Sequence, residues 1–402
     1  MTATQTLSVN QVASVFNGKT PSKAQQRESG HPVLKIKDVD ELGRFRGTFS
    51  GHIEPELAEK HTKQRIVGGE TLILNAAHNA THVASKTYYA DGEVAGSLAT
   101  GEWLMIRWNK DATDQRYGNH WINTPETRFR LRQLVNGIHL YPKDVARLQI
   151  PLPPLAEQKR IAGILDAADA LRARRRESLA QLDTLLQSTF LDMFGDPVTN
   201  PMEWEELSII DLCESSDDVR CGPFGTQLHQ HEFRDSGVPL WGIKHVNAGF
   251  AFPTDEFISD TKAASLSQYS IMPGDLVMTR KGTIGNCYIY PSTLEPGIMH
   301  SDLLRLRLSP VKADAQFVCS QFTYSRNIQR QLELMSPGAV MPGINVTKLK
   351  KLEVEAPPLS LQRRFAAIVE SVEQQKASQR AHLDELDTLF ASLQSRAFNG
   401  EL

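Results

Sequence analysis

The feature that most constrains the fold of this chain is a stretch that occurs twice. Residues 148–194 align without a gap with residues 352–398, and 17 of the 47 aligned positions are identical. The identities include the run Leu-Asp-Thr-Leu at 182–185 and again at 386–389. A period of about 200 residues is too long for a solenoid unit and indicates a duplicated half-protein. The chain of 402 residues is therefore expected to consist of two similar halves in tandem.

Each copy of the repeated stretch has the pattern of a short strand, a proline stop and a long helix. Residues 148–150 and 352–354 are apolar at alternate positions, which is typical of a strand. The Pro-Pro pair that follows lacks amide donors, so it ends the strand and can precede a helix start. From Ala156 onward, Gly163 is the sole glycine or proline before Gly195.

Apolar residues recur in both copies at the spacing of an amphipathic helix, and Leu171 falls in the same pattern. Two long, matching helices favour a two-helix coiled coil in which they pair with each other. The alternative is two helices that pack separately on two globular domains. The residues expected at the seam between the helices are Ile161, Leu165, Leu179, Leu182, Leu186, Phe365, Ile368, Leu383, Leu386 and Phe390.

The composition is that of an ordinary globular protein, with 40% hydrophobic and 23% charged residues. No apolar run approaches the ~18 residues that a membrane span needs. The polar N-terminus has no export leader, so we expect a cytoplasmic protein. The cysteines form no Cys-x-x-Cys pair, which favours reduced thiols over a zinc site. They are Cys213, Cys221, Cys287 and Cys319.

The net charge of −3 is not the signature of a chain that grips nucleic acid alone. Any DNA binding must come from local clusters or be shared with a more basic partner. Residues 1–147 carry 19 Lys and Arg against 15 Asp and Glu, a balance of +4, whereas the other segments are slightly acidic.

The duplication extends beyond the long helices into the segments before them. Residues 30–39 match residues 237–246 in Gly, Pro, Ile, Lys and Val, and both globular halves consist mainly of short strands and turns. A linker with a helix-ending Gly195 and two prolines separates the halves. The expected division has two globular domains, each followed by a helical region. The four segments are 1–147, 148–196, 197–351 and 352–402.

Motifs for catalysis are missing from the sequence. It has no GxxxxGK[ST] phosphate loop, and residues 282–285 lack the strand–GxGxxG–helix context of a dinucleotide site. The Asn-Pro-Pro-aromatic tetrad of amino-methyltransferases is also missing. His78 and His82 have the spacing of helical metal ligands, but the Asn-Ala-Thr between them favours a polar loop that contacts solvent or nucleic acid. We expect no catalytic apparatus, cofactor or metal in this chain.

Polar and cationic side chains in the duplicated loops suit recognition of base edges and phosphates. Arg and Lys pair with guanine, Asn pairs with adenine, and Ser or Thr pairs with either. Ordinary exposure to solvent is the alternative for each of them. The candidate DNA-contacting residues are Lys37, Arg44, Arg46, Asn75, His78, Asn79, His82, Lys244, His245, Asn247, Arg280, Lys281, Thr283, His300 and Ser301.

The run Arg-Ala-Arg-Arg-Arg at 172–176 lies on the first long helix. Its arginines are expected to contact phosphates of DNA that is not read by sequence. A solvated face and a patch for a partner protein are equally good interpretations of this run.

Over essentially its whole length the chain resembles the specificity subunit of type I restriction-modification systems. One recognition site departs from the pattern: residues 69–72 read Gly-Glu-Thr-Leu where the second half has Gly-Asp-Leu-Val. The segments that carry the resemblance are Pro153–Arg160, Pro357–Arg364, Met193–Pro197, Gly222–Gly225 and Gly274–Val277.

The resemblance implies an α+β fold with two mixed α/β target-recognition domains joined by two long antiparallel helices, related by an internal pseudo-two-fold repeat. Each domain would read one half of a split double-stranded DNA target, and the helices would set the spacing between the halves.

The resemblance also implies partners for the chain. Two methyltransferase subunits that use S-adenosylmethionine would dock on this non-catalytic chain, and restriction motor-nuclease subunits that use ATP and Mg would join through them. Two alternatives stay open: a specificity subunit of a methyltransferase assembly without a nuclease, and a coiled-coil adaptor that binds protein. The sequence does not predict the bases that are read or the gap between them.

Overall fold

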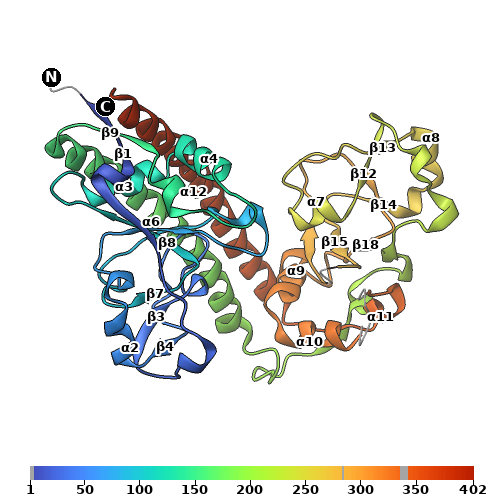
Figure 1. The fold of residues 1–402 in the computed structure, drawn as a ribbon. Coiled ribbons are helices and arrows are strands. Elements are labelled where there is room, and N and C mark those ends of the chain that lie inside the picture. Colours follow the sequence, from blue (N-terminus) through green and yellow to red (C-terminus); the bar gives the residue numbers. More distant parts are fainter. Residues whose placement is uncertain (1–3, 283–284, 336–342) are drawn as a thin grey trace. The chain divides into compact units, whose positions relative to one another are not determined.

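The structure divides the chain into two compact units that share the long helices (Figure 1). Unit 1 comprises residues 1–176 and 381–402, and unit 2 comprises residues 177–380. This computed structural model describes residues 4–282, 285–335 and 343–402. The units differ from the four segments drawn from the sequence, because each boundary falls inside a long helix: α6 (Leu155–Phe194) or α12 (Leu359–Asn399).

Unit 1 contains three small sheets. The smallest is the pair β1-β9, and the other two have the strand orders β2-β8-β5-β6 and β4-β3-β7. The central strand β8 is almost fully buried, so it forms the middle of the core. The strands are β1 (Gln5–Ser8), β2 (Ala13–Asn17), β3 (His31–Leu34), β4 (His52–Ile53), β5 (Thr71–Leu74), β6 (Thr87–Tyr89), β7 (Leu98–Ala99), β8 (Trp103–Trp108) and β9 (Gln149–Leu152). The short helices are α1 (Val9–Val12), α2 (Pro55–Lys60), α3 (Gln115–Ile122), α4 (Pro125–Gln133) and α5 (Pro142–Val145).

Unit 2 repeats this plan, with β10 paired to β19 and with sheets of the order β11-β18-β15-β16 and β13-β12-β17-β14. The strands are β10 (Glu206–Ser208), β11 (Val219–Cys221), β12 (Val238–Trp241), β13 (Phe257–Ile258), β14 (Ser270–Ile271), β15 (Leu276–Thr279), β16 (Cys287–Ile289), β17 (Gly297–Met299), β18 (Leu303–Leu306) and β19 (Glu353–Glu355). The short helices are α7 (Ile243–Asn247), α8 (Asp260–Ser265), α9 (Ala315–Tyr324), α10 (Arg326–Leu334) and α11 (Val346–Lys350). The expected internal repeat is confirmed in the strand order.

Each unit contains a parallel strand pair among its otherwise antiparallel pairs. β3 runs parallel to β7 in unit 1, and β12 runs parallel to β17 in unit 2. Parallel strands end at the same edge of a sheet, so the loops that follow them are brought together. This edge positions the candidate site in each unit.

The expected strand, proline stop and helix are confirmed in both copies.

The duplicated glutamine near the start of each long helix links that helix to the globular part of its own unit. The Gln158 and Gln362 Oε1 atoms accept from the backbone N–H groups of Asp114 and Asp314, at 2.9 Å in both units. Their Nε2 atoms donate to the carbonyl of the first proline of each Pro-Pro pair, at 2.9 and 2.7 Å. Both aspartates cap the following helix, α3 or α9.

The ends of the long helices are also equivalent. Gly195 follows α6 with a φ of 84°, and Gly400 follows α12 with a φ of 76°. A left-handed residue directly after the last helical residue is the common way to end a helix, and glycine adopts it without steric cost. The interpretation of Gly195 as a helix end is confirmed.

The two long helices pair antiparallel within each unit. In unit 1 the first half of α6 lies against the last half of α12, and Arg172 Nε donates to Asp387 Oδ1 at 2.5 Å. In unit 2 the second half of α6 lies against the first half of α12, and Lys376 pairs with Asp183 at 2.7 Å. Each aspartate belongs to a copy of the Leu-Asp-Thr-Leu run, so this identity preserves an ion pair across the helices.

Two arginines of the run at 172–176 have partners that none of the three interpretations from the sequence predicted, whereas Arg174 is exposed and remains open to all three. Arg172 also pairs with Asp169 at 2.7 Å and lies over the ring of Phe390 at 4.3 Å. Arg176 also pairs with Asp387, at 3.0 Å. These two arginines therefore link the helices, because both extend from α6 and pair with Asp387 on α12.

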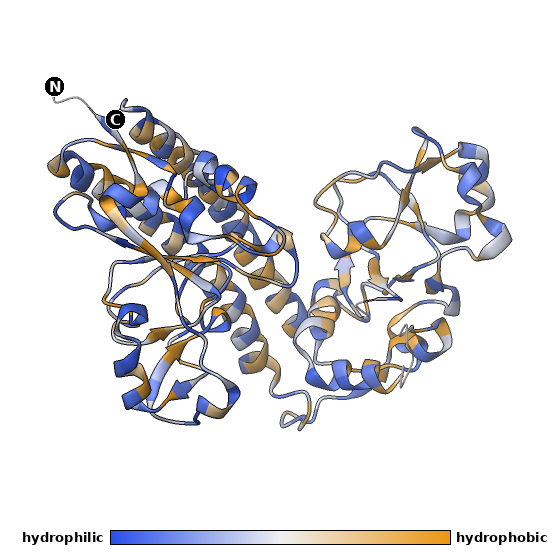
Figure 2. Ribbon diagram, in the orientation of Figure 1, coloured by the Kyte–Doolittle hydropathy of each residue, from blue (hydrophilic) through white to orange (hydrophobic). Residues whose placement is uncertain are grey.

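The expected seam residues are buried or partly buried, but they do not form a free rod. Leu182 and Leu186 belong to the core of unit 2, and Ile161 and Leu165 belong to the core of unit 1. Phe365 is fully buried, whereas Leu179, Ile368, Leu383, Leu386 and Phe390 are partly buried. The helices thus pair with each other and also pack on the globular part of each unit. Both long helices carry hydrophobic and hydrophilic residues along their length (Figure 2).

One apolar residue of the periodic pattern lies outside the seam. Leu171 is 50% exposed, so its inclusion was wrong. The next residue, Arg172, instead faces the other long helix. On α12 two further polar residues, Lys376 and Gln379, are buried. Polar groups at inward positions of a helix pair fix its register at a cost in stability.

Candidate nucleic-acid interface

Loops from four parts of unit 1 meet where the parallel strands β3 and β7 end. Thr100 N donates to the carbonyl of Leu34 at 3.2 Å, which joins the loops after these two strands. Gly18 N donates to Trp103 O at 2.9 Å, and Asn75 N donates to Glu102 O at 2.8 Å. We call the loops that begin at Gly18, Lys35, Asn75 and Thr100 the unit 1 loop cluster.

Unit 2 has the same hydrogen bonds at the equivalent edge. His300 N donates to Trp241 O at 2.8 Å, Gly222 N to Leu303 O at 3.1 Å, and Arg280 N to Asp302 O at 3.0 Å. We call the loops that begin at Gly222, Gly242, Arg280 and His300 the unit 2 loop cluster. The backbone arrangement of the cluster is therefore duplicated together with the helices.

One glycine in each cluster is required by close backbone contact. A Cβ on Gly18 would lie 2.2 Å from the carbonyl oxygen of Thr100, and one on Gly222 would lie 2.1 Å from that of His300. Real Cβ atoms do not approach an oxygen so closely, so any other residue would push the two loops apart.

A buried carboxylate fixes the start of β5 in unit 1 and of β15 in unit 2. Glu70 is fully buried and accepts from Arg107 Nε at 2.9 Å, while Asp275 accepts twice from Arg307, at 2.8 Å each. Glu70 also accepts from the backbone N–H groups of Val67 and Gly68. The Gly-Glu-Thr-Leu departure from the family pattern therefore keeps a carboxylate that pairs with an arginine.

Most of the residues expected to contact DNA in unit 1 are exposed. Lys37 lies in the loop cluster, and Arg46 Nε donates to the Lys37 carbonyl at 3.1 Å, so the Arg46 guanidinium lies against the backbone of this loop. Arg44 lines a separate cavity of about 630 Å³ within unit 1. The exposed residues of this set are Lys37, Arg44, Arg46, His78, Asn79 and His82.

Asn75 differs from this set because it is buried. Its Nδ2 donates to Asn17 Oδ1 at 2.8 Å and to the carbonyl of Gly101 at 3.0 Å. The side chain therefore holds three loops of the cluster together, and we remove Asn75 from the residues expected to contact bases. Asn79 accepts from Thr81 N at 3.0 Å and begins the short helix that contains His82.

The expected residues of unit 2 gather at its loop cluster, and most already have partners. Lys244 pairs with Asp255 at 2.5 Å, and Lys281 pairs with Asp302 at 2.7 Å. Arg280 donates to the carbonyl of Ser301 at 3.2 Å. Asn247 accepts from Asn286 Nδ2 at 2.8 Å. His300 lies 3.6 Å from Asp302, and Thr283 falls outside the described residues.

His245 is fully buried, so it does not face a ligand as expected. Burial, with the nearby Lys244, lowers the pKa of His245 below its ordinary value. Its Nδ1 accepts from Gly242 N at 3.1 Å, as Asp38 accepts from Lys35 N at 2.8 Å in unit 1. Each side chain closes the turn after a parallel strand, so the repeat tolerates a neutral imidazole or a carboxylate there.

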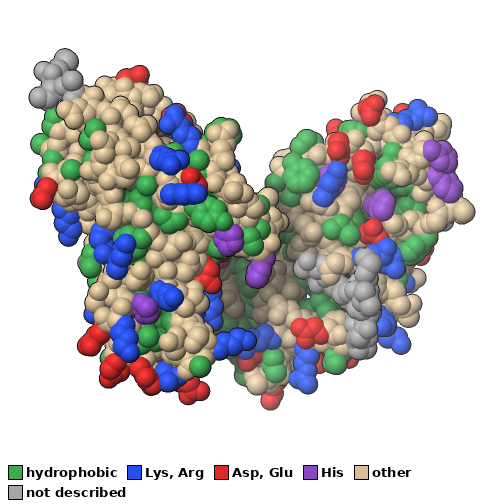
Figure 3. Space-filling view, viewed as in Figure 1, with side chains coloured by type: hydrophobic (Ala, Val, Ile, Leu, Met, Phe, Trp, Pro, Cys, Tyr) green, Lys and Arg blue, Asp and Glu red, His purple; other side chains and the backbone are tan. Residues whose placement is uncertain are grey.

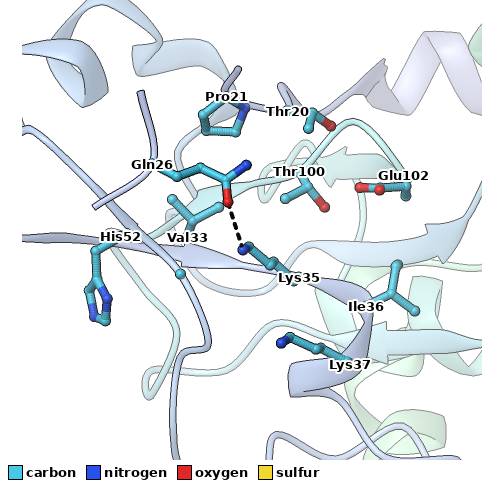
Figure 4. Close-up of a pocket in the computed structure, with 11 residues that line it drawn as sticks. Thr20, Pro21, Gln26, Val33, Lys35, Ile36, Lys37, His52, Thr100 and Glu102 are labelled. Atoms are coloured by element: carbon cyan, nitrogen blue, oxygen red, sulfur yellow. Dashed lines mark hydrogen bonds between the residues drawn. The ribbon is translucent and has the colours of Figure 1, made fainter. Parts of the chain in front are cut away.

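Several residues of the clusters were missed from the sequence. In unit 1 a cavity of about 360 Å³ is lined by Lys35, Thr100 and Glu102, among others (Figure 4). In unit 2 the Arg280 guanidinium lies over the half-exposed ring of Phe224, at 4.8 Å. The aligned repeat offered a signal for one of them. Thr20 and Phe224 occupy equivalent turns, so extending the alignment through these loops would have pointed to Phe224.

Charge is not concentrated in one patch. On the face shown in Figure 3, Lys and Arg side chains are interspersed with Asp and Glu in both units. Within the described ranges, no three His, Cys, Asp or Glu residues are grouped so as to hold a metal ion. No helix in the same ranges is long and apolar enough to cross a membrane.

Comparison with known proteins matches the chain twice to one family. The family described as "Type I restriction modification DNA specificity domain" matches residues 3–182 and 201–388. These two matches cover most of the chain and follow the two halves of the repeat.

Curated relatives and a solved structure agree with this match. The EcoKI type I restriction enzyme specificity subunit of Escherichia coli K12 is 22% identical over 98% of this chain and 88% of its own length. The MjaVIII type I restriction enzyme specificity subunit of Methanocaldococcus jannaschii is 22% identical over 78% of this chain and 77% of its own length. The structure of a type I restriction-modification S subunit from M. genitalium has a TM-score of 0.58 at 14% identity, covering 98% of this chain and 96% of that one. This likeness confirms the fold.

Proposed function

This chain belongs to the type I restriction-modification DNA specificity family, and from that premise we propose how its two units read DNA and which subunits they serve. Each unit carries one target-recognition domain, and the two domains read the two parts of a bipartite double-stranded target. The chain supplies sequence specificity to a larger enzyme and is not itself the catalyst.

The observation that carries this proposal is the duplicated loop cluster. Both clusters use the same backbone hydrogen bonds, while the side chains at equivalent positions differ: Lys35 against Gly242, and Thr100 against His300. A fixed frame with variable side chains is what two readers of different sequences need. Base-edge contacts carry sequence information, whereas phosphate contacts carry mainly affinity.

The charge of the chain limits how much of the affinity it supplies. Each phosphate contact that releases counterions strengthens binding, and a chain with a net charge of −3 has few such contacts to offer. Lys37 and Arg46 in unit 1, and Lys244 and Lys281 in unit 2, are the cations we place near phosphates. A more basic partner supplies the remainder.

We infer that this partner is a methyltransferase subunit, present in two copies. Leu389 in unit 1 and Leu185 in unit 2 occupy the same place in the repeat, and each is 48% exposed on its long helix. Exposed leucines at equivalent positions suit two copies of one partner. The methyltransferase subunits bring S-adenosylmethionine and act on adenine, and restriction subunits that use ATP and Mg join through them.

The test is to express this chain in cells together with the methyltransferase subunit of its own system and to map methylated adenines. We expect one motif with two specified parts and an unspecified gap, and no methylation by either protein alone. Methyl transfer by the purified chain alone, or a motif unchanged by omitting it, would contradict the proposal. DNA cleavage upon adding the restriction subunit distinguishes a complete restriction system from a methyltransferase assembly without a nuclease.

A further inference from the structure

The cavity in the unit 1 loop cluster has the side chains of a base-reading pocket, and this inference rests on the proposed function. It measures about 360 Å³ and lies beside the ends of β3 and β7. Figure 4 shows side chains from several loops converging on it. The lining residues that matter here are Gln26, Lys35, Gly51, Thr100 and Glu102.

The Lys35 side chain lines this cavity and passes over Gly51. Gly51 lies directly beneath its side chain: a Cβ at that position would lie 2.4 Å from Lys35 Cε and 2.6 Å from Nζ. The Nζ atom also donates to Gln26 Oε1 at 3.4 Å. The absence of a side chain at Gly51 thus allows the ammonium group to lie across the cavity.

Two oxygen-bearing side chains of the cavity have no partner. Thr100 is 3% exposed, and its buried Oγ1 makes no hydrogen bond to the part of the chain that the structure describes. The Glu102 side chain is exposed and forms no hydrogen bond or ion pair within those same residues. A buried hydroxyl without a partner is costly unless a ligand satisfies it.

Unit 2 has a different set of side chains at the same backbone positions. Gly242 stands where unit 1 has Lys35, and Glu256 stands where unit 1 has Gly51, since Leu240 N donates to Glu256 O as Val33 N donates to Gly51 O. Asp302, at the position of Glu102, is paired with Lys281 at 2.7 Å. The large and small residues have thus changed places. Of the two carboxylates at the Glu102 position, the one in unit 2 is paired, whereas the one in unit 1 has no partner within the described residues.

We propose that this cavity recognises a G·C base pair in the DNA half-site of unit 1. Lys35 donates to O6 or N7 of guanine, and Glu102 accepts from the N4 amino group of cytosine. These are the usual pairings of a lysine and a carboxylate with base edges in the major groove. A carboxylate near phosphates is repelled unless it accepts such a hydrogen bond, so Glu102 disfavours bases without an amino group at this edge.

The experiment maps the methylated motif in cells that express Lys35→Met or Glu102→Gln with the methyltransferase subunit. We expect preference at one G·C position of one half-site to fall by about 10- to 100-fold, with the other half-site unchanged. Lys60→Met removes an exposed lysine of unit 1 outside the cavity and should leave the motif as it is.

A second variant tests the positioning of Lys35 without removing its charge. Gly51→Ala places a methyl group where the Lys35 side chain lies, so it should relax the same base pair. The thermal unfolding midpoint of each purified complex separates this effect from loss of fold. A folded Gly51→Ala complex with an unchanged motif would contradict the claim that Lys35 must lie over Gly51 to read the base pair.

The outcomes distinguish this inference from the proposed function. If the unaltered complex makes no bipartite motif that depends on this chain, both are overturned. If the motif is bipartite but Lys35→Met and Glu102→Gln leave it unchanged, the pocket inference alone is overturned. A half-site of unit 1 that specifies A·T pairs alone would overturn it as well.

Discussion

Units 1 and 2 have the same backbone frame and present different chemistry on it. Gly18 and Gly222 make the same close approach to a neighbouring loop, and Glu70 and Asp275 both pair with an arginine. By contrast, the side chains at equivalent positions of the two loop clusters share little. The difference teaches that duplication preserved how the loops are held and left their tips free to change specificity.

The largest effect on this comparison is expected from breaking the buried ion pairs. Asp275→Asn leaves the Arg307 guanidinium without its counter-charge, and Glu70→Gln does the same to Arg107. Removing one partner of a buried pair costs about 3–5 kcal/mol, and the partly exposed arginines place these variants near 3 kcal/mol. Hydrogen exchange should rise in the unit that carries the substitution and stay unchanged in the other.

If Asp275→Asn and Glu70→Gln each loosen both units equally, the frames are not independent. A matched control is Glu59→Gln, which alters an exposed carboxylate of unit 1 and should change exchange in neither unit.

The next effect is a pH dependence confined to unit 2. Burial, with Glu206 and Asp196 nearby, raises the pKa of Glu355 from 4.5 to about 7. Between pH 4.5 and about 7 the folded state therefore keeps a proton on Glu355 that the unfolded state has lost. The free energy of unfolding is accordingly highest below pH 4.5 and declines as the pH rises to about 7. The loss is at most about 3 kcal/mol.

Unit 1 has Pro151 at the position of Glu355, as the pairing of β9 and β19 with β1 and β10 shows. Glu355→Gln should therefore flatten the pH dependence of unit 2 and raise its protection from exchange at pH 8. An equal pH dependence in the substituted chain would assign the titration to another group.

A smaller effect is expected at the two close-approach glycines. Gly18→Ala and Gly222→Ala force adjoining loops apart, and overpacking of this kind costs about 1–3 kcal/mol. We expect each variant to weaken methylation through its own unit, with both half-sites still required. Gly92→Ala offers a control, since a Cβ there meets no atom within 4 Å.

The smallest effect is expected where the long helices are joined by charge. Asp387 accepts from Arg172 and Arg176, whereas Asp183 pairs with Lys376 and is more exposed, at 65% against 40%. Partly exposed ion pairs contribute about 0–1 kcal/mol. Asp387→Asn should lower the thermal unfolding midpoint slightly more than Asp183→Asn, and the reverse order would mean that the aromatic contact of Arg172 dominates.

Regular features of this fold were predictable because local sequence determines them. The Pro-Pro stop and the helix end at Gly195 each act within a few residues of where they stand. The pairing of the two long helices also follows from their equal length and matched apolar spacing, whereas their antiparallel direction was implied by the family resemblance.

The candidate site was harder to predict, because burial of a loop residue depends on contacts far away in sequence. Asn75 is polar like its exposed neighbours His78 and Asn79, yet it is buried because its side chain donates hydrogen bonds to Asn17 and Gly101. Arg172 looked like a surface cation until Asp387, from the other helix, supplied its partner. Lys35 was overlooked because its importance depends on the missing side chain of Gly51.

The most direct measurement of the central claim is an exchange of one reader. Residues 13–147 are replaced by the corresponding segment of a relative, which keeps β1 with its partner β9, and the methylated motif is mapped in cells with the methyltransferase subunit. The account predicts that one half of the motif changes to that of the relative while the other half stays the same. A motif that changes in both halves, or in neither, from a folded and active complex would contradict two independent readers.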